Sequence, residues 1–141
     1  MAPAGDSQIS GGKIAVFPLN VMEGQNRMFI EIQPQEELCI LRFGGRFASG
    51  AQLDYLEEKL DEIRNLAPSK VLADFREVTA IGSTGLGFVV RVFQAVTNRP
   101  TGRFVIAGLT PRLRETFEIT RLAGLIPLAA DLDAAKRALL S

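Results

Sequence analysis

The sequence predicts a single α/β domain in which a small, mainly parallel sheet of four to five strands carries about four helices. Two observations support this fold class. The chain has 141 residues, of which 47% are hydrophobic and 23% charged, so it can bury a core without disulfide or metal cross-links. From about residue 37 onward, short apolar segments alternate with segments of helical period. This alternation is typical of helices that right-handed crossovers lay against a parallel sheet.

The N-terminal region differs in composition from the rest of the chain. Residues 1–12 are mostly small or polar and bury too little surface to offset the entropy of ordering, so we expect a flexible arm there. The short apolar segment 13–17 stops at Pro18 and is a candidate for an extra edge strand. We therefore divide the chain into an N-terminal extension, residues 1–27, and a domain, residues 28–141.

Two strands and a helix are predicted in the first half of the domain. Residues 28–33 alternate between apolar and polar, and residues 37–43 are more continuously apolar. The two segments predict a hairpin that ends at the glycine pair 44–45. In residues 51–66 the apolar side chains recur every three or four positions, which predicts an amphipathic helix with a solvated acidic side. Its inward positions are Leu53, Leu56, Leu60 and Ile63.

A strand, a glycine-rich loop and a second helix follow. Residues 70–75 are a candidate for a buried strand, and residues 78–81 lead into the glycine-rich loop 82–87. A helix is predicted over about residues 84–97, and its side chains are apolar around more than half of its circumference. Such a helix is expected to pack between neighbouring elements. Its apolar surface is interrupted by Gly87, Arg91 and Gln94.

The last third of the chain predicts one more strand, a helix, a short strand and a terminal helix. The first strand spans residues 103–109, and the helix covers about residues 111–123. The signals for the ends of this helix are Thr110 as N-cap, Pro111 at the first position and Gly124 after the last turn. A small strand is expected at 126–128, and Asp131 is expected to cap the terminal helix. Its inward residues are Leu132, Ala135 and Leu139.

The composition excludes several classes of protein. Histidine is absent, which excludes Ser-His-Asp and Cys-His catalysis. The 16 basic and 16 acidic residues balance, so the diffuse positive charge that drives non-specific nucleic-acid binding is missing. Cys39 lies in an apolar segment and is interpreted as a core residue, not a metal ligand or reactive thiol. No segment reaches the ~20 apolar residues of a membrane span, and the start lacks the features of a signal peptide, so we expect a cytoplasmic protein.

The glycine-rich loop, Gly82-Ser83-Thr84-Gly85-Leu86-Gly87, is the most conspicuous motif in the chain. Its outer glycines have the spacing of a phosphate-binding P-loop. However, Phe88 stands where that loop needs lysine, and Val89 stands where it needs serine or threonine. The glycine order also differs from the G-x-G-x-x-G order of dinucleotide-binding proteins. An enzyme that binds a nucleotide cofactor through this loop is therefore disfavoured.

The hydroxyl groups of the loop allow two further interpretations. Ser83 or Thr84 at a helix start can act as an N-cap, whose oxygen accepts hydrogen bonds from backbone N–H groups. The same position suits a phosphoserine, because a phosphate there meets the positive end of the helix dipole and free N–H groups. A phosphate would add charge without unfolding the domain, so it would have to act through a partner surface.

The segment from Asp74 to Gly87, DFREVTAIGSTGLG, resembles the motif D-[LF]-x-x-V-x-x-[IL]-D-S-[ST]-G-L-G of STAS domains, which include the anti-sigma-factor antagonists of bacteria. Residues 103–120 resemble the strand that follows in this family and its segment x-P-x-[VL]-[RK]-x-x-[FL]-x-[LI]-T. Residues 122–140 are similar to the last strand and helix. The resemblance covers about residues 28–140 and implies a STAS-like fold.

The resemblance implies a regulatory domain without catalytic activity or cofactor. In this family the unmodified domain binds an anti-sigma factor of histidine-kinase-like ATPase fold, and this binding frees the sigma factor to activate transcription. That kinase phosphorylates the motif serine, and a metal-dependent serine/threonine phosphatase removes the phosphate. Carried over by position, Ser83 is the phosphoacceptor, and Thr84 is the alternative. The partner-binding residues are Gly82, Ser83, Thr84, Gly85, Leu86 and Gly87.

One position departs from the family motif. Gly82 stands where the family has an aspartate immediately before the serine. Some STAS domains serve as scaffolds in signalling assemblies or accompany lipid or anion transport systems, and these functions need no phosphoacceptor. A scaffold or transport-accessory domain is therefore the alternative that the resemblance leaves open.

Overall fold

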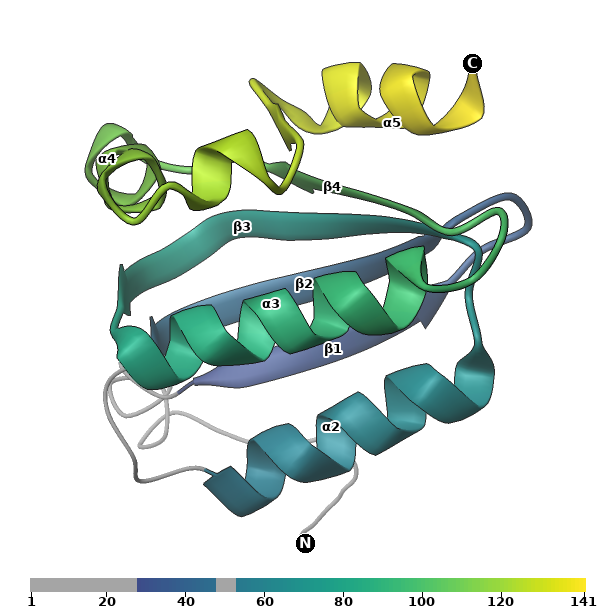
Figure 1. Ribbon diagram of the computed structural model, residues 1–141, viewed down its shortest axis with the longest axis horizontal. Coiled ribbons are helices and arrows are strands. Elements are labelled where there is room, and N and C mark those ends of the chain that lie inside the picture. Colours follow the sequence, from purple (N-terminus) through teal and green to yellow (C-terminus); the bar gives the residue numbers. More distant parts are fainter. Residues whose placement is uncertain (1–27, 48–52) are drawn as a thin grey trace, which may run out of the picture.

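A computed structural model describes residues 28–47 and 53–141. The predicted edge strand at 13–17, the arm at 1–12 and the first two residues of the helix predicted from 51 lie outside these ranges. The strands form one sheet in the order β1-β2-β3-β4-β5 (Figure 1). Among the described strands only the β1–β2 pair is antiparallel, which confirms the predicted hairpin within a mixed, mainly parallel sheet. The strands are β1 (Phe29–Pro34), β2 (Cys39–Phe47), β3 (Lys70–Ile81), β4 (Arg103–Ala107) and β5 (Leu128–Ala129).

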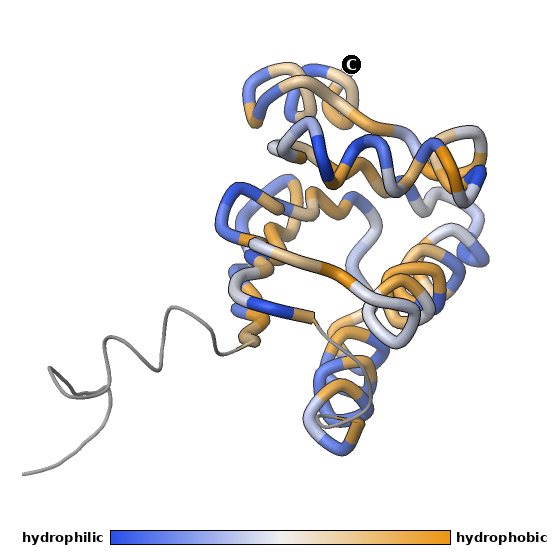
Figure 2. Tube along the Cα trace, turned by 90° about the vertical axis from the view of Figure 1, so that its left-hand side faces the viewer, coloured by the Kyte–Doolittle hydropathy of each residue, from blue (hydrophilic) through white to orange (hydrophobic). Residues whose placement is uncertain are grey.

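Helices cover both faces of the sheet. They are α2 (Leu53–Leu66), α3 (Ser83–Thr97), α4 (Pro111–Ile119), the short 3-10 helix η1 (Leu122–Gly124) and α5 (Leu132–Leu140). Successive strand side chains point to opposite faces. Val71 and Ala73 join the core beneath α2, α3 and α4, whereas Leu72 packs with α5 on the other face. Figure 2 shows hydrophobic and hydrophilic residues alternating along the helical coils, as expected of helices with one buried side.

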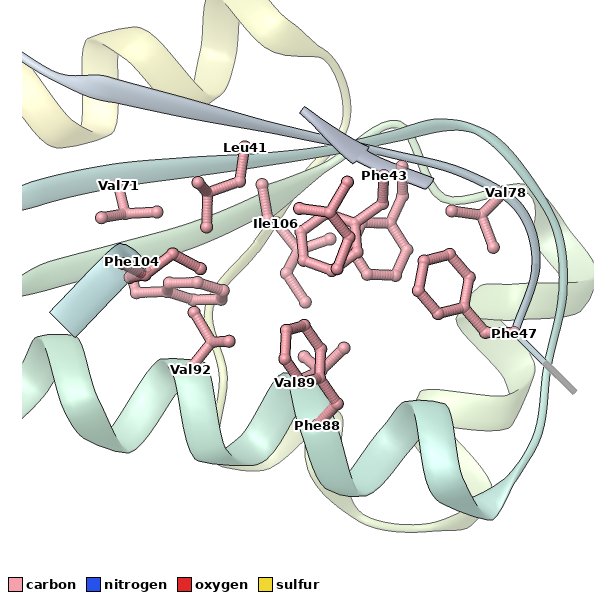
Figure 3. Close-up of a cluster of buried hydrophobic side chains, with 14 of the residues drawn as sticks. Leu41, Phe43, Phe47, Val71, Val78, Phe88, Val89, Val92, Phe104 and Ile106 are labelled. Atoms are coloured by element: carbon pink, nitrogen blue, oxygen red, sulfur yellow. The ribbon is translucent and has the colours of Figure 1, made fainter. Parts of the chain in front are cut away.

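An aromatic cluster fixes the first turns of α3 against the sheet. The ring centroids of Phe43 and Phe75 are 4.7 Å apart, and those of Phe43 and Phe88 are 6.2 Å apart. Phe88, Val89 and Val92 point from α3 toward the strands (Figure 3). Offset and edge-on pairs at these separations are the arrangements that aromatic rings prefer. The N-terminal end of α3 is therefore held by buried contacts, and the loop before it has a defined position.

The glycine pair 44–45 ends the predicted hairpin but does not end the second strand, which runs beyond its predicted end at residue 43. The pairing of β1 with β2 does stop at Gly44, but β2 continues to Phe47 and stays paired with β3 through two register shifts. Gly45 has φ 82°, a left-handed conformation that favours glycine, and the ring of Phe29 fills the space where Gly44 would carry a side chain. The glycines therefore mark irregular pairing inside a strand, where glycine is common.

The predicted ends of the last strand and helix also need correction. β4 stops at Ala107 and not at residue 109, because Gly108 turns the chain with φ 84°. α4 ends at Ile119 and not near 123, because Arg121 adopts a left-handed conformation with φ 66°. A short 3-10 turn then replaces the last predicted turn. The two predicted caps are confirmed: Thr110 Oγ1 accepts a hydrogen bond from the N–H of Leu113, and Asp131 Oδ1 accepts one from the N–H of Ala134.

Cys39 is an interior residue, as predicted. Its side chain is 3% exposed at the start of β2, and burial raises the pKa of its thiol. The neutral thiol is therefore the favoured form, and a neutral thiol is a poor nucleophile and metal ligand.

Candidate functional site

The glycine-rich loop joins the end of β3 directly to the start of α3. Gly82 is the N-cap of the helix, and its N–H donates a 2.8 Å hydrogen bond to the carbonyl of Phe47. Its own carbonyl accepts a hydrogen bond from the N–H of Leu86. Gly82 and not a hydroxyl residue is the N-cap, and no side chain of the described residues caps the helix, so the interpretation of Ser83 or Thr84 as the N-cap is wrong. The helix begins one residue earlier than predicted, with Ser83 at its first position.

Because the helix begins at Ser83 and Gly82 is its N-cap, the Ser83 side chain does not cap the helix. Ser83 is exposed, and its hydroxyl has no hydrogen-bond partner among residues 28–47 and 53–141. Gly82 has φ −111° and ψ −170°, extended values that any residue can adopt. Glycine is nearly as good an N-cap as threonine. Gly82 therefore still caps the helix, although the family motif has an aspartate at this position. The loop therefore presents a free hydroxyl at the positive end of a helix.

The other two glycines of the loop have opposite environments. Gly85 is buried, and a Cβ there would lie 2.8 Å from Ile81 Cγ1 and 2.8 Å from Phe47 Cβ. Gly87 is exposed, and a Cβ there would meet nothing within 4 Å. Gly85 therefore allows α3 to approach the end of β2, whereas Gly87 leaves open surface where a helix would normally carry a side chain.

A surface groove of about 440 Å³ runs between α2 and the first turns of α3. Leu53, Leu56 and Phe88 give it apolar walls, and Leu53 is 53% exposed. Its remaining lining residues are Glu57, Ser83, Thr84, Gly87 and Arg91. An apolar centre with a polar rim is the general composition of a surface that binds another protein.

An ion pair joins α2 to α3 across this groove. Arg91 Nη1 and Nη2 both donate to the carboxylate of Glu57, with Nη2 and Oε1 3.3 Å apart. The hydrogen bond from Arg91 lowers the pKa of Glu57, and the same bond raises the pKa of Arg91. The side chains are 45% and 49% exposed for Arg91 and Glu57, so water screens the pair and its contribution to stability is small.

The buried polar side chain of the described region, Asp74, is fully engaged elsewhere. Its carboxylate accepts three hydrogen bonds from Arg76, from the backbone N–H, Nε and Nη2, at 3.0, 3.1 and 3.0 Å. Within residues 28–47 and 53–141 no three acidic or cysteine side chains gather as metal ligands. No helix in that part of the chain is long and apolar enough to cross a membrane.

The structure brings some of the predicted site residues together and separates others. Ser83, Thr84 and Gly87 line one groove. Gly82 caps the helix, Gly85 is buried, and Leu86 packs against the core while remaining partly exposed. The position that a P-loop gives to lysine is Phe88, which is 3% exposed and points into the core, so it cannot reach a phosphate.

The sequence interpretation missed five residues of the groove: Leu53, Leu56, Glu57, Phe88 and Arg91. One signal was available, because Gly87 and Arg91 interrupt an otherwise apolar helix four and eight positions after Ser83. Residues four apart lie on the same side of a helix. Glu57 gave no such signal, since it belongs to a run of acidic residues that looks uniformly solvated.

Comparisons with known proteins agree with this architecture. The family model described as STAS domain matches residues 29–135. No curated protein matches the chain. Among solved structures, the chain is similar to an anti-sigma factor antagonist from Mycobacterium paratuberculosis, with 20% identity, a TM-score of 0.72, and coverage of 82% of this chain and 96% of that one.

Two further structures extend the comparison. A STAS domain protein from Planctomyces limnophilus, described as an anti-sigma-factor antagonist, is 18% identical, with a TM-score of 0.68 and coverage of 79% and 98% of the two chains. The Bacillus cell fate determinant SpoIIAA in its phosphorylated form is 18% identical, with a TM-score of 0.56 and coverage of 79% and 99%. At these identities the likenesses establish a shared fold.

Proposed function

The chain belongs to the STAS domain family, and from this premise we propose that it is an anti-sigma-factor antagonist whose Ser83 is a phosphorylation switch. Its fold is the one found in anti-sigma factor antagonists. The observation that carries the proposal is the state of Ser83. Its hydroxyl is exposed at the first position of α3, beside a half-apolar groove, and it has no partner among the described residues. A serine kept for capping would have its oxygen engaged.

In this proposal the unmodified chain binds an anti-sigma factor of histidine-kinase-like ATPase fold in the cytoplasm. The groove and the loop form the contact surface, and the sigma factor is released to direct transcription. The ATPase transfers the γ-phosphoryl group of ATP to Ser83: the oxygen–phosphorus bond to Ser83 forms, the bond to ADP breaks, and the hydroxyl proton leaves. A metal-dependent phosphatase hydrolyses the phosphoester with water and returns the serine and inorganic phosphate. The chain itself catalyses neither step.

The phosphate would end the complex by its charge. Phosphoserine adds about −1.5 to −2 charges at neutral pH, and it would stand at the edge of the groove that also contains Glu57. A dianion in a contact surface must be desolvated or repelled when the partner binds, and this costs several kcal/mol. The helix start tolerates the same charge, because it favours anions. The modified domain is therefore expected to stay folded and lose its partner.

Gly82 favours a second candidate function. Because it replaces the aspartate that the family has before its serine, the chain is also a candidate for a STAS scaffold in a signalling assembly or for an accessory of a lipid or anion transport system. Neither role needs a phosphoacceptor.

Affinity capture from a native lysate, with wild-type and Ser83→Asp baits in parallel, separates the two candidates. We expect the wild-type bait alone to retain an ATPase of histidine-kinase-like fold, identified by mass spectrometry. Retention of the same transporter or scaffold components by both baits would favour the second candidate.

A further inference from the structure

Three residues of α3 form one open track along the groove. Ser83, Gly87 and Arg91 are spaced by four, so they lie on the same side of the helix, and all three line the groove. A Cβ at Gly87 would meet nothing within 4 Å. Gly87 therefore places no side chain of α3 between Ser83 and Arg91.

Arg91 has the reach to meet a phosphate on Ser83. Eight residues of α-helix separate the two Cα atoms by about 12 Å. Standard bond lengths place a guanidinium about 6 Å from its Cα and a phosphoserine phosphorus about 4 Å from its own, and an ion pair spans about 3 Å more. Helical side chains lean toward the N-terminus, so Arg91 leans along the track toward Ser83, and a phosphate on Ser83 meets it by turning toward the C-terminal side of its own Cα.

The ion pair between Arg91 and Glu57 is weak. Glu57 and Arg91 are each nearly half exposed, so solvent screens their attraction. A phosphate dianion has a larger charge than a carboxylate and three acceptor oxygens, and arginine matches its geometry with two parallel hydrogen bonds. Gly82 places no negative charge next to the phosphate. The other charges that act on the pair are Arg64 on Glu57 and Asp61 on Arg91.

We propose that Arg91 recognises a phosphate on Ser83 and leaves Glu57 to do so. This inference rests on the proposed function and adds the residue through which the modification changes the groove. In the unmodified chain, the groove contains a neutral ion pair that joins α2 to α3. In the modified chain, Arg91 lies along α3, the link between the helices is lost, and Glu57 becomes an unpaired carboxylate facing any partner. The modification therefore changes the pairing of Glu57 and Arg91 in the groove, in addition to placing a phosphate at its edge.

The test is a ³¹P NMR titration of the full chain with phosphoserine inserted at position 83 during synthesis. A nearby cation favours the dianionic phosphate and lowers its second pKa. We expect Arg91→Gln to raise that pKa by about 0.5, because the cation is lost. We expect Glu57→Gln to lower it, because the carboxylate no longer competes for Arg91. Arg137→Gln is the matched control, since Arg137 is exposed on α5, on the other face of the sheet, and should leave the pKa unchanged.

Equal phosphate pKa values in the Arg91→Gln and Arg137→Gln proteins would overturn the inference. A rise confined to Arg91→Gln supports it. Because the phosphoserine is inserted during synthesis, the titration does not depend on any kinase. A chain that is never phosphorylated in cells would therefore contradict the proposed function, whereas an unchanged titration contradicts only the role of Arg91.

Discussion

Replacing Ser83 by aspartate is expected to weaken binding of the ATPase partner by about 100-fold or more, which corresponds to about 2.7 kcal/mol. The substitution puts a fixed negative charge at the first position of α3, on the edge of the groove. A charge desolvated or repelled in a contact surface costs this much or more. Titration calorimetry with the purified partner measures the effect.

Two control variants separate charge at this site from other causes. Ser83→Ala is expected to bind within about threefold of wild type, because the hydroxyl has no partner to lose among the described residues. Thr101→Asp adds the same charge at an exposed position beyond the other end of α3, and is expected to bind normally. If Thr101→Asp weakened binding as much as Ser83→Asp, net charge and not the loop would govern the complex.

The two glycines of the loop that lie within α3, Gly85 and Gly87, are expected to change stability in opposite directions when replaced by alanine. Gly85→Ala should lower the free energy of unfolding by about 1–2 kcal/mol. The new Cβ would lie 2.8 Å from Phe47 Cβ and 3.2 Å from the Phe47 carbonyl oxygen, and overpacking of this kind outweighs the gain in helix propensity. Thermal and denaturant unfolding measure the difference.

Gly87→Ala should raise the free energy of unfolding by up to about 1 kcal/mol, because the added methyl group lies in open space inside a helix. The same variant should bind the partner less tightly, since the methyl group projects into the proposed contact surface. A glycine that costs stability yet is needed for binding is a common trade-off. If both alanine variants destabilised the chain equally, the description of the loop would be wrong.

Much of the fold could be predicted from the sequence because its elements follow simple periods. Three of the four inward residues predicted for 51–66, Leu56, Leu60 and Ile63, are buried in α2, whereas Leu53 is exposed in the groove. The caps Thr110 and Asp131 act as predicted. The second strand runs beyond its predicted end at residue 43 for a physical reason. Glycine usually interrupts a strand, but here Phe29 packs over Gly44 and β2 stays paired with β3 through two register shifts.

The site was less predictable than the fold. The position of Ser83 at the loop follows from the motif, but its lack of a capping role depends on a shift of one residue in the helix start. Such boundaries are the least certain part of a sequence interpretation. Glu57 and Arg91 lie 34 residues apart in the chain, on two different helices. No local pattern reports a contact of that kind, because it arises only when α2 and α3 pack side by side.

The measurement that tests the central claim most directly is phosphopeptide mapping of the chain isolated from its own cells, under conditions in which its partner is present. We expect phosphoserine at Ser83 in a substantial fraction of the molecules, with Thr84 unmodified. We also expect the molecules bound to the ATPase to lack this phosphate. An unmodified Ser83 under all conditions, or a phosphate confined to Thr84, would contradict the assignment of Ser83 as the switch.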